Sequence, residues 1–300
     1  MWQALAGYAV RGPAQGALLS FSTLLLSLVF PPLVVVSNAL IALVWLRLGP
    51  QKGLICVAIA LIAGTVVASF SGSPVIPAAL MASFWAPVVL MAYLLRRTVS
   101  LNLALLAGAV LALAGVTIAY MVLDDPSQSW QGMVEHVRSQ TEVAAGGADN
   151  NTRVEEWLAT AGTWMTGFSA ATQFVVAVLS LLLARAWQAR MFNPGGLQEE
   201  FHGLRFGRAA GAIGLLIVAA SVFLDVELLK NLAIVVLVVF TLQGLAVLHA
   251  LATQLRVHPL LLVSLYVFLL LPTSIKVFGM LGLVDTWVDF RSRVNVQKRD

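Results

Sequence analysis

The sequence predicts an all-α fold, a polytopic transmembrane helical bundle of about eight segments, of which two are broken by proline. Of the 300 residues, 60% are hydrophobic and 11% are charged, whereas a soluble domain carries about 25% charged residues. Several separated apolar runs are long enough to cross a bilayer, which takes roughly 18 residues. The sequence does not show the alternating strands of about ten residues that a membrane β-barrel needs.

The first apolar segment, 17–46, is interrupted in the middle by Phe30-Pro31-Pro32. Each half has about 14 residues and, at ~1.5 Å per residue, covers only about 21 Å of a hydrocarbon core that is ~30 Å thick. The prolines lack backbone donors and clash with the preceding turn, so the chain either kinks or turns back at mid-membrane. Broken helices persist in lipid where protein or a polar cavity covers the freed backbone groups. The break is therefore the first indication of a binding site.

The remaining segments alternate with polar regions, and the last of them is interrupted by Pro272. The prediction is a single integral membrane domain over residues 1–300, with an extracytoplasmic amphipathic insertion at 124–161 and a cytoplasmic elbow at 185–208. The further segments are 53–70, 74–95, 99–123, 162–186, 209–224, 228–253 and 258–283.

The orientation follows from the basic residues in the short loops, which favour the cytoplasm. Arg96-Arg97 and the elbow are separated by two crossings, with the acidic insertion outside, and Arg47 fits the same side. Arg11 reaches that side only if the first segment returns to the side from which it entered. The basic C-terminal tail requires the same of the last segment; alternatively, the tail breaks the rule.

Polar side chains are few within the apolar segments, and at membrane depth such groups mark sites or bonds between helices. For His249, hydrogen-bonded packing is the alternative to a proton relay. Lys276 either binds an anionic group or extends to the cytoplasmic surface. The candidate ligand-binding residues are Asn38, Asn102, Gln243, His249 and Lys276, and the other polar side chains at depth include Asn231 and Gln254.

Two sets of small residues recur at four-residue spacing, which places each set on one helix face. Small residues let helix backbones approach closely in lipid. The faces pack within the chain or, alternatively, against a partner subunit. The first set is Ala104, Gly108 and Ala112, and the second is Gly203, Gly207 and Gly211.

The sequence lacks the motifs that are typical of several function classes. Cys56 is the only cysteine, so neither an intrachain disulfide nor a thiolate metal cluster is possible. The chain has no phosphate-binding loop, no zinc-protease motif and no hydrolase nucleophile motif. We therefore predict no enzymatic activity, no metal and no cofactor. The net charge of +4 is distributed as topology signals are, so we predict no nucleic-acid partner.

The elbow contains Asn-Pro-Gly-Gly at 193–196, which is a strong turn signal. It ends the helix that begins near residue 162. Glu199 and Glu200 then open the next helix favourably, because acidic residues suit a helix N-terminus. The elbow is either an interfacial turn or a docking surface for a partner protein.

Near the C-terminus, Asp285, Asp289 and Arg293 lie four positions apart. On a continuous helix they share one face, so ion pairs along that face are expected. Trp287 and Phe290 then point toward lipid or the core. The simplest interpretation is a solvated charged face.

Two stretches, Ala184–Phe201 and Gly282–Arg291, resemble the YybS-like family of predicted bacterial inner-membrane proteins, as does the overall layout. The family has no settled activity, so the resemblance assigns no catalytic residue. It implies a multi-pass protein of the bacterial inner membrane. The motif residues, hypothetical contacts for a partner, are Arg190, Asn193, Pro194, Gly195, Gly196, Glu199, Glu200, Phe201, Asp285, Trp287, Asp289 and Arg291.

The family is in turn distantly similar to the substrate-binding S components of energy-coupling-factor transporters and to the cell-shape protein MreD. The first similarity implies a small-molecule-binding or transport subunit that depends on an energising partner, because the chain has no nucleotide site. The second implies a non-enzymatic scaffold or assembly factor that binds membrane or cytoplasmic proteins. S components have six helices, and this chain has more apolar segments than that.

Overall fold

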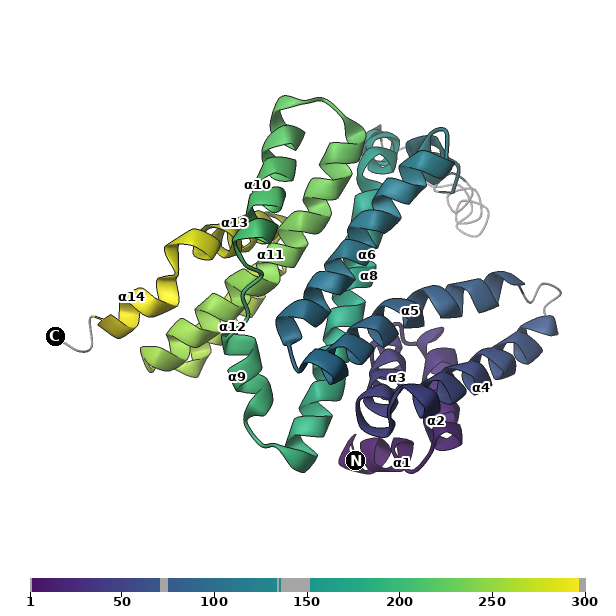
Figure 1. Cartoon of the computed structure of the whole chain (residues 1–300). Coiled ribbons are helices and arrows are strands. Elements are labelled where there is room, and N and C mark those ends of the chain that lie inside the picture. The colour runs from purple at the N-terminus through teal and green to yellow at the C-terminus, as the bar shows by residue number, and fades with distance from the viewer. Residues whose placement is uncertain (1, 71–74, 134, 136–151, 297–300) are drawn as a thin grey trace. The chain divides into compact units, whose positions relative to one another are not determined.

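The computed structural model describes residues 2–70, 75–133, 135 and 152–296, and every regular element in these ranges is a helix (Figure 1). The predicted all-α class is confirmed. Among the described residues, four helices can cross a membrane by length and composition, or up to five if one bent pair counts as a single span. The protein is therefore a multi-pass membrane protein whose apolar helices contact the lipid bilayer. The number of eight segments stays a prediction.

The contacts divide the chain into two compact units. Unit 1 comprises Met1–Val110 and Gln173–Phe206, and unit 2 comprises Leu111–Thr172 and Gly207–Asp300. The helices α6 (Leu101–Val122) and α8 (Thr152–Phe192) contribute to both units. Each unit has its own central helix, and the prediction of one integral membrane domain stays a prediction.

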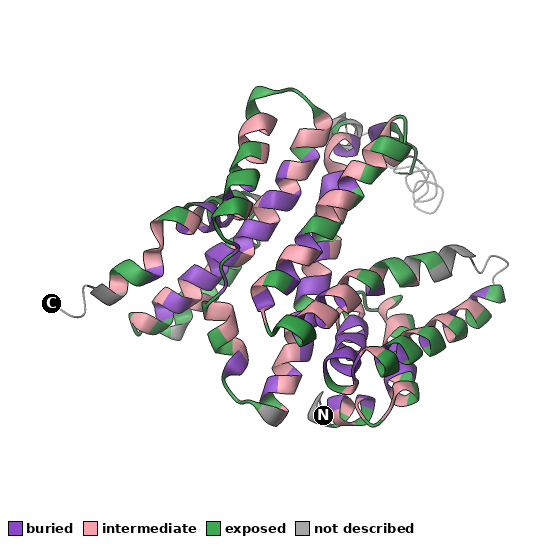
Figure 2. Cartoon of the chain, viewed as in Figure 1, coloured by how far each residue is buried: buried purple, intermediate pink, exposed green. Residues whose placement is uncertain are grey.

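Unit 1 contains α1 (Trp2–Ala9), α2 (Pro13–Ser27), α3 (Leu33–Leu48), α4 (Pro50–Ser69), α5 (Val75–Thr98) and α9 (Gly196–His202), with the adjoining parts of α6 and α8. Its central helix is α3, which contacts α2, α4 and α5. The stretch from Ser37 to Leu46 is buried without interruption (Figure 2). A helix that is apolar on all sides, as α3 is, belongs inside a bundle.

The helices α2 and α3 form an antiparallel hairpin. Ser37 Oγ donates a hydrogen bond to the Ser20 carbonyl at 2.7 Å, and a Cβ on Gly16 would overlap with the Val44 side chain. The helices have 15 and 16 residues, so each is about 22–24 Å long and too short for a hydrocarbon core of ~30 Å. The hairpin brings both ends of the first apolar segment to one end of unit 1, in agreement with the re-entrant interpretation of Arg11, and the sidedness of this segment in a membrane stays a prediction.

The hairpin tip, residues 28–32, is exposed and yet has a partner for every backbone donor. The N–H groups of Leu28, Val29 and Phe30 donate to carbonyls of the preceding turn, and Pro31 and Pro32 have no N–H to satisfy. A polar cavity over the break is therefore not required, contrary to the expectation from sequence. The physical reason is that local turns satisfy the donors which would otherwise be costly in lipid.

Unit 2 contains α10 (Arg208–Phe223), α11 (Glu227–Gln254), α12 (Pro259–Leu269), α13 (Pro272–Val288) and α14 (Phe290–Val296), with the adjoining parts of α6 and α8 and a helical stretch at 126–133. Its central helix is α11, the most buried of the long apolar helices (Figure 2). It packs mainly against α13 and α10.

The second proline-broken segment bends sharply, because Leu260–Leu269 and Thr273–Val288 meet at 115°. Beyond the bend, α13 lies against α11 where both helices carry glycine. A Cβ on Gly244 would overlap with the Phe278 carbonyl, and a Cβ on Gly282 would overlap with the Phe240 carbonyl. The two backbones are therefore in direct contact, the arrangement that small residues permit in lipid.

Part of the predicted small-residue packing is found within the chain. In unit 1, Gly108 lies against Met91, and in unit 2, Gly211 lies against Thr286. Gly207 instead occupies a left-handed backbone conformation at the start of α10, with φ of 86° and open space around it. Its role is to form a turn, which glycine does without steric cost.

Asn231 of α11 joins three helices inside unit 2. Its side chain is fully buried, and Nδ2 donates to the Tyr120 hydroxyl at 2.9 Å and to the Thr163 carbonyl at 2.7 Å. Oδ1 accepts from the Gly167 N–H at 2.6 Å. A Cβ on Gly167 would overlap with the Asn231 backbone, so the approach of α8 to α11 depends on this glycine.

The amphipathic insertion predicted at 124–161 stays a prediction, because residues 134 and 136–151 lie outside the described ranges. The described part begins with a helix cap. Asp125 Oδ1 accepts from the N–H groups of Gln128, at 3.1 Å, and Ser127, at 2.9 Å. These bonds hold the pKa of the Asp125 carboxyl below its usual value, and the bond from Gln128 has the largest effect.

Cysteines at Arg11 and Arg47 test the hairpin in a Cys56→Ala background. Both positions are exposed, and we expect both to react with a membrane-impermeant maleimide from the same side of the membrane, because α2 and α3 return to that side. Val29→Cys, at the exposed apolar tip, should be protected by lipid from either side. Reaction at 11 and 47 from opposite sides would show that the segment crosses.

Gly167→Ala tests the contact between α8 and α11. Overpacking of a tight contact costs about 1–3 kcal/mol, so we expect the free energy of unfolding in detergent to fall by that amount. Gly115→Ala is the matched control, since it lies on α6 in the same unit with nothing within 4 Å of the added Cβ. If the two variants were equally stable, the close packing at Gly167 would be wrong.

Candidate functional site

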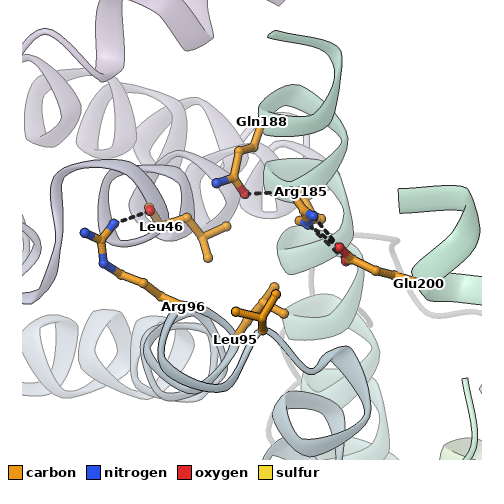
Figure 3. Close-up of a pocket in the computed structure, with 7 residues that line it drawn as sticks. Leu46, Leu95, Arg96, Arg185, Gln188 and Glu200 are labelled. Carbon is orange, nitrogen blue, oxygen red and sulfur yellow. Dashed lines mark hydrogen bonds and ion pairs between the residues drawn. The ribbon is translucent and has the colours of Figure 1, made fainter. Parts of the chain in front are cut away.

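A pocket of about 150 Å³ lies in unit 1, where helix ends and loops meet (Figure 3). Its residues come from α3, α5, α8 and α9, and from the turn after α5. Charged and polar side chains form one part of the wall, and aliphatic side chains form the rest. The lining residues are Arg96, Arg185, Gln188, Glu200, Leu46, Leu95 and Val99.

Arg96 joins the C-terminal ends of two helices at this pocket. Its Nη1 donates to the Leu46 carbonyl, one of the carbonyls that the end of α3 leaves without an intrahelical partner. The chain stops being helical at Val99, where φ is 52°, a conformation that is costly for a β-branched residue. Val99 is thereby exposed at the rim of the pocket.

Arg185 and Glu200 close the opposite wall across the elbow. Arg185 Nε donates to Glu200 Oε2 at 2.9 Å, and Nη2 donates to Oε1, so the pair is bidentate (Figure 3). The turn that makes this possible includes Gly195, in a left-handed conformation with φ of 92°. The predicted turn at Asn-Pro-Gly-Gly thus joins α8 to α9 and returns the chain so that Glu200 reaches Arg185.

Gln188 lies one helical turn beyond Arg185 on α8. Its Oε1 accepts from Arg185 Nη1 at 3.1 Å. Because the guanidinium has only donors, this bond fixes the direction of the amide. The Gln188 amide nitrogen then lies on the Leu46 side of the pocket (Figure 3).

The pocket has an excess of positive charge. It contains Arg96 and Arg185 but a single carboxylate, Glu200, which is paired with Arg185. Within the described residues, no carboxylate forms an ion pair with Arg96. The arrangement supplies donors and positive charge at a partly open site, which suits binding of an anionic group.

Three loops that carry the topology signals meet at this end of unit 1. Arg47 follows Leu46 directly, Arg96 bonds to the Leu46 carbonyl, and Arg185 lies across the same pocket. These loops therefore share one side of the unit, as the parity of the crossings predicts.

The two candidate ligand residues of unit 1 lie outside this pocket. Asn38 is fully buried in α3, where Nδ2 donates to the Phe84 carbonyl at 3.4 Å and Oδ1 has no hydrogen-bond partner among the described residues. Asn102 is half-buried, and its Oδ1 accepts from the Arg205 N–H at 3.1 Å. Both serve as links between segments, and their ligand roles stay predictions.

The other three candidates belong to unit 2, and the described contacts do not bring them together. Gln243 is buried and donates to the Gly282 carbonyl at 3.0 Å. His249 Nδ1 lies 2.8 Å from the Leu245 carbonyl and Nε2 lies 3.0 Å from the Tyr266 hydroxyl, which is the hydrogen-bonded packing considered as its alternative. Lys276 is exposed.

The motif residues comprise an exposed group, a partly buried group, one buried glycine and a buried charged pair. Arg190, Asn193, Pro194, Gly195 and Glu199 are exposed at the elbow, and Trp287 is exposed on α13. Phe201, Glu200 and Asp289 are partly buried and Gly196 is buried. The buried pair is Asp285 with Arg291.

The expected ion pairs along Asp285, Asp289 and Arg293 are not formed, because the helix ends at Asp289. That residue has φ of 49° and starts a turn between α13 and α14. The turn brings Arg291 back, so that its Nη2 donates to Asp285 Oδ2 at 2.7 Å. Arg293 instead donates to the Val288 carbonyl.

Gln243 extends this buried pair into a small network, since its Nε2 lies 3.2 Å from Asp285 Oδ2. The network ties α11, α13 and α14 together within unit 2. Both charged side chains are nearly inaccessible, so each depends on the other for compensation.

Sequence reasoning did not mark Arg96, Arg185 or Gln188 as site residues. Arg96 and Arg185 were assigned to membrane topology alone. One usable signal was the spacing around the elbow, because a tight turn at 193–196 places an acid on α9 opposite a base on α8. The bond between Arg96 and the end of α3 had no such local signal.

Residues 18–286 match the family described as Predicted membrane protein (DUF2232). The match covers most of the chain and includes every residue that lines the pocket. The chain belongs to this family. Neither a curated protein nor a solved structure matches it. The DUF2232 match thus identifies a membrane protein and assigns no activity to it.

Removal of one member of the buried ion pair should be more harmful than removal of both. Asp285→Ala leaves Arg291 buried without this carboxylate, and we expect a loss of about 3–5 kcal/mol in the free energy of unfolding. A double variant, Asp285→Leu with Arg291→Met, should recover much of that loss. Unfolding in detergent measures both, and a double variant less stable than Asp285→Ala would contradict the pair.

Proposed function

We propose that this chain is a non-enzymatic, YybS-like protein of the bacterial inner membrane that binds a small anionic ligand at the unit 1 pocket. The supporting observation is the pairing pattern of that pocket: Arg96 has no carboxylate partner among the described residues, whereas Glu200 is fully engaged by Arg185. The basic residues around the pocket favour the cytoplasmic side for it.

The size of the pocket limits the ligand. Its volume is about 150 Å³, whereas sites that enclose drug-sized molecules have about 300–1,000 Å³. A whole vitamin, as S components bind, does not fit inside. The similarity to S components is therefore limited in this proposal to the binding of some small ligand. Transport would also require a partner that supplies energy.

A scaffold role, by similarity to MreD, is the second candidate. It is favoured by the exposed elbow residues Asn193, Pro194 and Glu199, which are available to a membrane or cytoplasmic protein. In this alternative, Arg96 and Arg185 hold helix ends in place and no small ligand binds.

A substitution that fills the pocket separates the two candidates. Val99→Trp adds a large side chain at the rim, where Val99 is 77% exposed, and Val110→Trp is the control on α6, where Val110 is 63% exposed and does not line the pocket. We expect a protein-free extract of the host cytoplasm to raise the melting temperature of the purified wild type and Val110→Trp, but not of Val99→Trp. Ligand at about 100 times its Kd stabilises by about 2.7 kcal/mol.

No rise for the wild type, or an equal rise for Val99→Trp, would favour the scaffold over the binding protein.

A further inference from the structure

We propose that the pocket recognises a phosphate group, carried either by a soluble phosphate compound or by the head group of an anionic phospholipid. This inference rests on the proposed function, because it names the ligand class of the same pocket. It follows from the positions of the donors, the position of the single acid and the size of the space.

The first donor is the amide of Gln188. Arg185 Nη1 donates to its Oε1 at 3.1 Å, so the amide nitrogen must point away from Arg185 and toward the Leu46 side of the pocket (Figure 3). Within the described residues, that nitrogen has no acceptor. An amide held in this direction offers two N–H donors to a ligand and no acceptor.

The second donor is the guanidinium of Arg96. It is planar with five N–H donors, and the one bond that the structure shows for it uses Nη1 on the Leu46 carbonyl. The charge of Arg96 is therefore not neutralised within the described part of the chain. Arginine binds phosphate oxygens through paired, charge-assisted hydrogen bonds.

The Glu200 carboxylate lines the pocket but does not directly face an anion beside the Gln188 amide. Arg185 binds Glu200 through Nε and Nη2, and it lies between Glu200 and the Gln188 amide (Figure 3). A phosphate beside Gln188 thus faces the donating amide and the Arg185 guanidinium, with Arg96 lining the same pocket, while the carboxylate remains behind Arg185 (Figure 3). Glu200 sets the position of Arg185, and Arg185 sets the direction of Gln188.

The volume fits a phosphate group and little more. The cavity of about 150 Å³ has room for several water molecules, which a bound phosphate group would displace. The remainder of the ligand must lie outside the pocket, at the rim formed by Val99. Because the pocket lies where apolar helices end, both a soluble compound and a lipid head group reach it.

Two substitutions and a neighbouring control test the phosphate site. Gln188→Glu keeps the shape and the acceptor for Arg185 but replaces the donating nitrogen by a negatively charged oxygen. Arg96→Gln removes the unpaired charge. The control, Arg97→Gln, removes the same charge one residue away, where the guanidinium lies over the Tyr93 ring and outside the pocket.

The measurement is the melting temperature of the full chain titrated with inorganic phosphate at constant ionic strength. A parallel series uses nanodiscs of phosphatidylcholine with increasing phosphatidylglycerol. We expect stabilisation by at least one probe, with an apparent Kd that rises about tenfold or more in Arg96→Gln and Gln188→Glu and is unchanged in Arg97→Gln. A response to inorganic phosphate identifies the soluble source, and a response to phosphatidylglycerol alone identifies the lipid.

Two results would overturn the inference. One is no response to either probe; if the cytoplasmic extract nevertheless stabilises the wild type, ligand binding stands and the phosphate assignment fails. The other is an equal loss in all three variants, which would reduce the effect to general surface charge.

Discussion

The constraint on which this structure depends is that lipid offers no partner for a backbone hydrogen-bond donor. At the hairpin tip, every backbone donor is satisfied locally. The N–H groups of Leu28, Val29 and Phe30 donate to the preceding turn, and the prolines that break the helix carry no N–H. The same constraint accounts for Asn231, whose amide takes up polar groups of three helices inside unit 2. At Gly244 and Gly282, the absence of a side chain lets two helix backbones come into direct contact.

Much of this architecture could be predicted from periodicity, length and proline. Most helix limits follow the apolar runs closely, although α8 (Thr152–Phe192) extends beyond the predicted segment 162–186 at both ends. The hairpin of α2 and α3 agrees with a first segment whose halves are each too short to cross. The turn at 193–196 was also readable, because Asn-Pro-Gly-Gly has few other conformations available. These are local or nearly local properties, and a single sequence contains them.

The pocket and the buried network could not be predicted, because they depend on where distant segments meet. Arg96 bonds to a carbonyl 50 positions earlier, a contact that leaves no pattern in the residues between. Asp285 was assigned to a continuous helical face, and a single left-handed residue, Asp289, changed its partner to Arg291. The direction of the Gln188 amide depends on Arg185, which in turn depends on Glu200 across the elbow.

The hairpin of α2 and α3 also has a consequence for the surrounding lipid. In a hairpin that enters a bilayer, upright helices of 15 and 16 residues reach about 22–24 Å into a hydrocarbon core of ~30 Å, past its midplane, so acyl chains need to cover only the last few ångströms beyond the tip. The exposed apolar side chains of Leu28, Val29 and Phe30 are then the groups that meet those acyl chains.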